Sequence, residues 1–283
     1  MSSVREIYVS DIIKAVRNLC IDANYYLSKD IKNKLKQSLE EETWPIAKDV
    51  LEKIIENAEI AELENVPMCQ DTGMACVFVS IGQDVHIVGG LLEEAINQGV
   101  RQGYKDGYLR KSVVKDPLDR INTGDNTPAV IYYEIVPGNK LKIVLAPKGF
   151  GSENMSKIKM LKPSDGIEGV KNFILDTVKE AGPNPCPPTI IGIGIGGTFD
   201  KVAVLAKKAL LRPINKDNEN PFYADLEKEL LSEINKSGIG PQGFGGKTTS
   251  LGVNIEVYPT HIAGLPVAVN VSCHATRHAE IIM

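Results

Sequence analysis

The stretch Ala129–Ala146, AVIYYEIVPGNKLKIVLA, decides the fold class. Two runs rich in β-branched and aromatic residues, 129–136 and 141–146, flank the dipeptide Pro137-Gly138. Such runs predict strands, and proline followed by glycine favours a type II turn. We therefore expect an antiparallel hairpin, which excludes an all-parallel sheet.

The rest of the sequence divides into two regions with different hydrophobic patterns. Residues 1–62 carry apolar side chains at three- and four-residue steps, which predicts three helices. The rest alternates between β-rich runs and helical stretches; the runs are 75–81, 189–195, 250–257 and 267–271, and the helical stretches lie at about 90–104, 165–181, 199–211 and 222–236. We expect a mixed α/β (α+β) fold in one domain, 1–283, with a helical N-terminal region (1–62) packed on a mixed β-sheet core (63–283).

Composition excludes several classes of protein. The chain has 283 residues, of which 43% are hydrophobic and 24% charged, as in ordinary globular proteins. Lys and Arg number 32 against 36 Asp and Glu, so no basic excess points to nucleic acid. Charged residues interrupt positions 1–20, and the longest apolar stretches fall short of the roughly 20 residues of a membrane span. We expect a cytoplasmic protein that binds neither nucleic acid nor membrane.

Two glycine-rich stretches resemble nucleotide-binding motifs. Gly192–Gly197 matches the dinucleotide fingerprint, and Asp217 follows Gly197 by 20 residues. A polar loop at 212–221 and another helix follow it, however, instead of a second parallel strand, so we expect these glycines only to permit close backbone approach to something compact. Gly240–Thr248 misses the P-loop spacing because Pro241 stands where glycine is needed. A nucleotide-binding enzyme that uses Gly192–Gly197 and Gly246–Thr248 is therefore only a remote alternative.

The five cysteines are Cys20, Cys69, Cys76, Cys186 and Cys273. Their odd number and wide spacing do not form a disulfide framework. Cys20 lies on a helical apolar stripe and Cys76 in a strand-like run, where core packing explains them. The other three lie in or beside segments rich in glycine, proline or small residues. Three such thiols can bind a compact iron–sulfur cluster, leaving one iron of a four-iron cube as a Lewis acid for substrate.

Two polar clusters have simpler interpretations. His274 and His278 have the spacing of zinc ligands on a helix, but no short Cys pair accompanies them, and a solvated terminal turn is the simpler hypothesis. The acidic triplet Glu40–Glu42 is interpreted as a solvated face.

Five motifs in order resemble the class I (iron–sulfur) fumarate hydratase/tartrate dehydratase family. They are PMCQDTG (67–73), YLRKSV (108–113), NTGDNTP (122–128), KGFGSEN (148–154) and NVSC (270–273). The resemblance is to its α subunit, or the N-terminal half of single-chain members, and covers residues 5 to 280. It implies that Cys69, Cys186 and Cys273 bind a [4Fe–4S] cluster.

The resemblance also implies a set of substrate residues. Gln70 and Asp71 contact the dicarboxylate, and Arg110 pairs with one carboxylate through its planar fork. Gly151 offers its backbone to substrate. His261 partners Asp71, and the pair moves the proton on the substrate hydroxyl.

The implied activity is the reversible hydration of fumarate to L-malate. L-tartrate dehydratase is the nearest alternative, since its substrate differs by one hydroxyl. An electron-transfer iron–sulfur subunit is a more distant alternative, because its cluster would require a fourth thiolate ligand. The base that acts at the β-carbon belongs to a second half of these enzymes, so the resemblance implies a separate β subunit in an α2β2 assembly.

Overall fold

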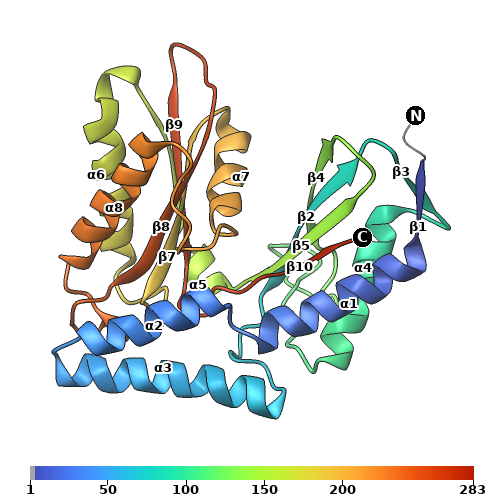
Figure 1. The fold of residues 1–283 in the computed structure, drawn as a ribbon, viewed down its shortest axis with the longest axis horizontal. Coiled ribbons are helices and arrows are strands. Elements are labelled where there is room, and N and C mark those ends of the chain that lie inside the picture. The colour runs from blue at the N-terminus through green and yellow to red at the C-terminus, as the bar shows by residue number, and fades with distance from the viewer. Residues whose placement is uncertain (1–3) are drawn as a thin grey trace. The chain divides into compact units, whose positions relative to one another are not determined.

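The computed structural model describes residues 4–283, and these form two compact units (Figure 1). Unit 1 comprises the residues up to Leu27 together with Asn57–Phe150 and Arg277–Met283. Unit 2 comprises Ser28–Glu56 and Gly151–Thr276. Each unit gathers segments from distant parts of the chain. The single-domain organisation stays a prediction.

Unit 1 is built on a four-stranded sheet in the order β10-β5-β2-β4. Helices α1 and α4 pack together beside it and bury an apolar core. A small parallel pair, β1 with β3, completes the unit. The bounds are β1 Arg5–Tyr8, α1 Val9–Tyr25, β2 Met74–Gly82, β3 Val85–Val88, α4 Leu92–Asp106, β4 Val130–Val136, β5 Leu141–Lys148 and β10 Ala279–Ile282.

The expected hairpin between β4 and β5 is wrong, because β2 lies between them. β2 pairs parallel with β4 and antiparallel with β5. The turn after β4 crosses the end of β2, where the Gly82 N–H donates to the Lys140 carbonyl (2.8 Å). A Cβ at Gly82 would lie 2.4 Å from the Gly138 carbonyl oxygen, so only glycine permits this crossing. The mixed sheet that the hairpin implied is nevertheless confirmed.

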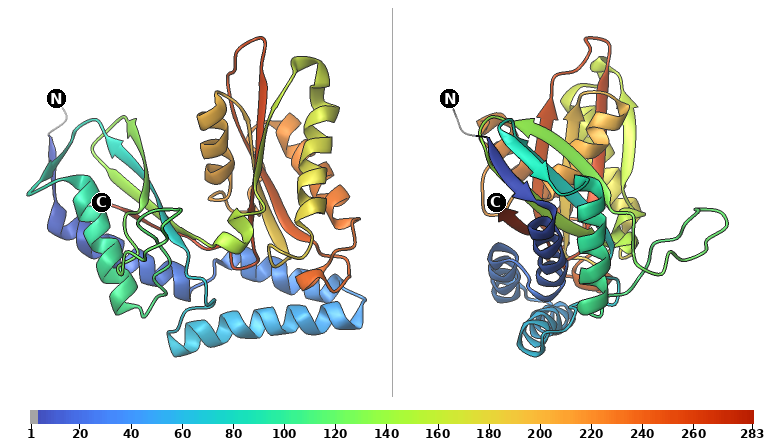
Figure 2. Two further views of the ribbon diagram at one scale, coloured as in Figure 1. Left: turned by 180° about the vertical axis from the view of Figure 1, so that it is seen from behind. Right: turned by 90° about the vertical axis from the view of Figure 1, so that its right-hand side faces the viewer.

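Unit 2 is built on a second four-stranded sheet, in the order β6-β9-β7-β8. α6 and α8 cover one face and α7 the other (Figure 2), as in an α/β sandwich. The bounds are α2 Lys29–Glu41, α5 Phe150–Glu153, β6 Lys157–Leu161, α6 Gly166–Ala181, β7 Thr189–Gly196, α7 Phe199–Ala209, α8 Pro221–Asn235, β8 Ser250–Tyr258 and β9 Leu265–Ser272; α3, Pro45–Glu64, begins in unit 2 and ends in unit 1. The expected mixed α/β class is confirmed. Within residues 4–283 no helix is both long and apolar enough to cross a membrane.

The stretch Gly192–Gly197 has a structural role in unit 2. A Cβ at Gly192 or Gly194 would lie 2.2 Å from a carbonyl oxygen of α7, so these glycines let the helix approach β7. A parallel neighbour, β8, does follow after the second helix, contrary to the sequence expectation. Asp217, however, pairs with Lys228 (Oδ2 to Nζ, 3.1 Å). The close backbone approach expected at these glycines is therefore to helix α7.

Candidate functional site

Cys186 and Cys273 lie at the same end of the unit 2 sheet. β7 and β9 run antiparallel with Ile190 opposite Ser272. Cys273 directly follows β9, and Cys186 precedes β7 by three residues. His274 Nδ1 lies 3.0 Å from the Cys186 carbonyl oxygen, which ties the two segments together. Two of the three expected cluster ligands are thus brought to one place.

The Cys186 loop presents its side chain outward. Cys186 is exposed and has a left-handed φ of 55°. The next residue, Pro187, accepts hydrogen bonds at its carbonyl from the backbone N–H (2.7 Å) and the side-chain amide (2.8 Å) of Gln242. That amide also lies 3.3 Å from His274 Nδ1. His274 lies in a turn, as expected, but it is half-buried there by contacts with two segments distant in sequence.

In unit 1, the segment Cys69–Gly73 enters β2, with Cys69 half-buried and Gln70 exposed. Both carboxylate oxygens of Asp71 accept backbone hydrogen bonds, Oδ1 from Gly73 (3.0 Å) and Oδ2 from Phe150 (2.9 Å). Two donors from different segments fix the orientation of this side chain. Asp71 is therefore oriented by hydrogen bonds from the chain itself.

Arg110 is held against the same loop by its backbone, while the residue itself is exposed. The Thr72 hydroxyl donates to the Arg110 carbonyl (3.0 Å). Asn126, fully buried with a φ of 62°, accepts from the Ser112 N–H (2.6 Å) and donates to the Gly73 carbonyl (3.2 Å). Unit 1 thus brings Arg110 to the loop that carries Asp71. Sequence reasoning assigned Asn126 no role, although asparagine tolerates a left-handed backbone better than most residues.

Asp125 anchors the motif that contains Asn126. Burial raises the pKa of its carboxyl, but hydrogen bonds from Arg101 Nε (2.8 Å) and the Thr127 hydroxyl (2.7 Å) outweigh burial and hold that pKa well below its ordinary value. The motif is therefore fastened to α4, which carries Arg101.

Gly151 and His261 lie at opposite ends of the unit 2 sheet. A Cβ at Gly151 would find the Asn184 carbonyl oxygen at 3.9 Å as its nearest neighbour, so open space remains there, beside the Cys186 loop. His261 is exposed in the loop between β8 and β9 (Figure 1). The eight residues of β9 separate it from Cys273 by about 26 Å at 3.3 Å per residue. The sheet therefore brings Gly151 toward the two cysteines and keeps His261 away from them.

The remaining cysteines are unsuited to metal binding. Cys20 is fully buried, and burial raises the pKa of its thiol far above the ordinary value. Cys76 is buried within β2. Since the thiolate is the metal ligand, neither is a candidate for a fourth ligand. Among residues 4–283, no three His, Cys, Asp or Glu side chains gather closely enough to hold one metal ion, so a role for Cys69 beside Cys186 and Cys273 stays a prediction.

The glycine loop before β8 binds a carboxylate of its own chain. Glu42, only 1% exposed, accepts the Lys247 N–H at 2.7 Å and the N–H groups of Thr43 and Trp44 at 2.8 and 3.0 Å. Burial raises the pKa of Glu42, but these three donors outweigh burial and lower it. Interpreting Glu42 as part of a solvated face is wrong, because it joins this loop to the start of α3. The Glu42 carboxylate thus accepts the Lys247 N–H, which a phosphate bound by this loop would need as a donor.

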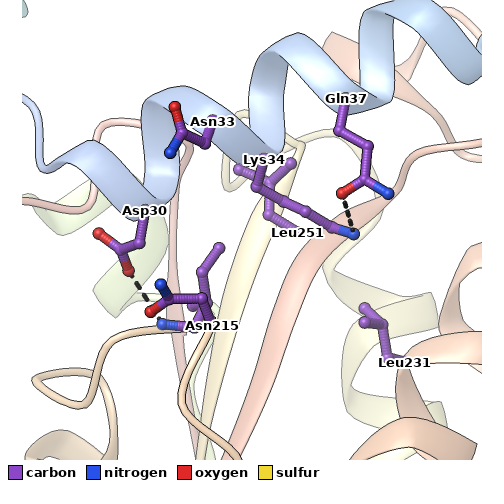
Figure 3. A pocket seen from close by; sticks show the side chains of 8 residues that line it. Asp30, Asn33, Lys34, Gln37, Asn215, Leu231 and Leu251 are labelled. Carbon is purple, nitrogen blue, oxygen red and sulfur yellow. Dashed lines mark hydrogen bonds between the residues drawn. The ribbon is translucent and has the colours of Figure 1, made fainter.

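One cavity of about 290 Å³ opens in unit 2 beside α2 (Figure 3). Its lining residues are Asp30, Asn33, Lys34, Gln37, Ile214, Asn215, Leu231 and Leu251. Asp30 accepts the Ile214 N–H (2.9 Å), and Lys34 donates to Gln37 (3.1 Å). No residue predicted for the site lines this cavity, and its two charged groups are already paired with neighbours.

A family model described as fumarate hydratase (Fumerase) matches residues 13–282 of the chain. The chain belongs to this family. It is 46% identical over 278 residues to a Methanocaldococcus jannaschii protein named "Putative L(+)-tartrate dehydratase subunit alpha", with 96% of each chain covered. It is 33% identical over 281 residues to the L(+)-tartrate dehydratase subunit alpha of Escherichia coli K12, covering 97% of this chain and 91% of that protein.

The fumarate hydratase family match confirms the resemblance inferred from the five motifs. The match begins within α1 and ends with β10, so it includes all the motifs that carry the resemblance. Family membership places the chain among hydro-lyases, while the names of the relatives differ from the family name in the substrate they give.

Proposed function

We propose that this chain is the α subunit of an iron–sulfur hydro-lyase that dehydrates L(+)-tartrate, with a separate β subunit. The observation that carries this proposal is the similarity, over 96–97% of the chain, to proteins named as L(+)-tartrate dehydratase α subunits. Hydration of fumarate is the second candidate, favoured by the description of the family model. The motifs alone favoured fumarate as the substrate, whereas the names of the relatives support tartrate better.

The two candidate reactions share one chemistry. Each breaks or forms a C–O bond next to a carboxylate and moves a proton at the neighbouring carbon. Loss of water from L-tartrate forms the enol of oxaloacetate, and loss of water from L-malate forms fumarate. Both require groups that hold two carboxylates and a group that moves the proton on the hydroxyl.

The exposure of three loop thiols supports a [4Fe–4S] cluster with three protein ligands. Cys69, Cys186 and Cys273 are half-buried or exposed in loops, whereas the other two thiols are buried. The shared sheet end of Cys186 and Cys273 supports their joint role. When bound, the cluster supplies an iron without a thiolate that acts as a Lewis acid.

The chain's own residues bind the substrate and move its proton. The exposed Arg110 guanidinium pairs with one carboxylate in a bidentate manner. Gln70 offers an exposed amide to the same ligand, and Gly151 leaves room for it to approach the backbone. Asp71, oriented by two backbone N–H groups, moves the proton on the hydroxyl. The partnership of His261 with Asp71 stays a prediction, since His261 lies far from Cys273.

The substrate is tested by coexpressing the chain with its β subunit without oxygen and measuring kcat/KM for L-tartrate and L-malate. We expect L-tartrate to be preferred by about tenfold or more, because a site that hydrogen-bonds the extra hydroxyl rejects the analogue that lacks it. A higher kcat/KM for L-malate would identify the enzyme as a fumarate hydratase instead. A cluster-loaded enzyme that turns over neither would overturn the hydro-lyase proposal. Native mass measurement tests the expected α2β2 stoichiometry.

A further inference from the structure

Arg277 is a buried arginine in unit 1 whose guanidinium is only partly hydrogen-bonded. The residue is 5% exposed. Its Nη2 donates to the Asp71 carbonyl. Its Nε and Nη1 are buried and have no hydrogen-bond partner. Throughout residues 4–283, no carboxylate forms an ion pair with it.

A buried guanidinium with two unpartnered N–H groups is suited to bind an anion. Removing a charge from water costs several kcal/mol unless a partner of opposite charge compensates. The other acceptors of the Asp71–Gly73 segment bind different donors. The Tyr104 hydroxyl lies 2.8 and 2.9 Å from the Thr72 and Gly73 carbonyls, to which it donates, and both carboxylate oxygens of Asp71 accept backbone N–H groups.

The position of Arg277 indicates which anion it binds. Its hydrogen-bond partner Asp71 stands two residues after Cys69, and Arg277 itself stands four residues after Cys273. Unit 1 offers a second arginine, Arg110, which is exposed and therefore suits a dicarboxylate that enters and leaves. A guanidinium sealed at 5% exposure suits a resident anion.

We propose that Arg277 is a positioning residue for the iron–sulfur cluster, donating its two unpartnered N–H groups to sulfur at the Cys69 end and offsetting cluster charge. This inference rests on the proposed function, because it requires the cluster. Hydrogen bonds and positive charge at cluster sulfur favour the more negative, reduced state, and they strengthen ligation. Loss of Arg277 should therefore make the reduction potential more negative and release iron faster.

The test compares Arg277→Gln and Arg277→Lys with the wild type, each reconstituted without oxygen together with the β subunit. We expect Arg277→Gln to lose iron to a chelator about tenfold faster or more and to shift the midpoint potential to a more negative value. Arg277→Lys, which keeps the charge without the planar fork, should restore part of the potential. Arg212→Gln is the matched control, because it removes another poorly exposed arginine, the partner of Glu227 in unit 2.

The outcomes separate this inference from the proposed function. A wild type that binds no iron and sulfide would overturn the cluster proposal itself. Normal potential and iron retention in both Arg277 variants, with a raised KM, would assign Arg277 to substrate and overturn the inference. Normal cluster properties with a lowered melting temperature, as expected for Arg212→Gln, would reduce Arg277 to a structural role. If Arg277→Gln does not fold, the potential of Arg277→Lys decides between these outcomes.

Discussion

At the scale of single residues, the environment of each thiol separates ligands from core. Cys69 is half-buried, whereas Cys76 is buried in β2. We expect Cys69→Ser to abolish iron and sulfide binding, and Cys76→Ala to retain both, because only the first removes a proposed ligand. Iron content per chain after reconstitution measures this. Equal loss of iron in the two variants would contradict the ligand assignment.

Asp125 gives a residue-scale prediction about pH. The pKa of Asp125 is held below its ordinary value of about 3.9, so its stabilisation is complete above that pH and is lost as the pH falls through the folded-state pKa. We expect Asp125→Asn to lower the free energy of unfolding by about 1 kcal/mol near neutral pH, with the difference shrinking below about pH 4.

Urea unfolding at several pH values measures the effect of Asp125→Asn. Asp217→Asn is the control, because its pair with Lys228 is exposed and such pairs contribute little. A difference between wild type and Asp125→Asn that grows on acidification would contradict the direction of the pKa shift.

At the scale of elements, the contact of β7 with α7 depends on two glycines. A Cβ at Gly194 would lie 2.2 Å from the Val202 carbonyl oxygen, and the helix must move to admit it. We expect Gly194→Ala to destabilise the chain by about 3 kcal/mol, as overpacking of a rigid contact does. Gly264→Ala is the matched control, since its added Cβ would make only ordinary contacts. Thermal unfolding measures both variants. Equal melting temperatures for Gly194→Ala and Gly264→Ala would show that α7 shifts at little energetic cost.

The sequence located the elements of this fold better than it paired them. Apolar periodicity and β-rich runs are local, so α6, expected at 165–181, is observed at Gly166–Ala181. Strand pairing joins segments that are distant along the chain, and nothing local to β4 and β5 indicated that β2 would lie between them. The same limit applies to the site. Cysteines in loops are visible in the sequence, whereas the contact of Arg277 with Asp71 joins residues 206 positions apart.

At the scale of the whole molecule, the proposed substrate groups of this chain do not suffice for a dicarboxylate. Arg110 supplies one guanidinium fork, while the substrate carries two carboxylates and needs a further base at the carbon that loses its proton. We expect the chain alone to bind iron and sulfide yet to show no turnover of L-tartrate or L-malate, and addition of the β subunit to restore activity. This is measured by reconstituting each subunit without oxygen, alone and in combination. The control is Arg110→Lys combined with the β subunit, which we expect to raise KM at unchanged iron content. Turnover by the isolated chain would show that one subunit holds a complete active site and would remove the need for a partner.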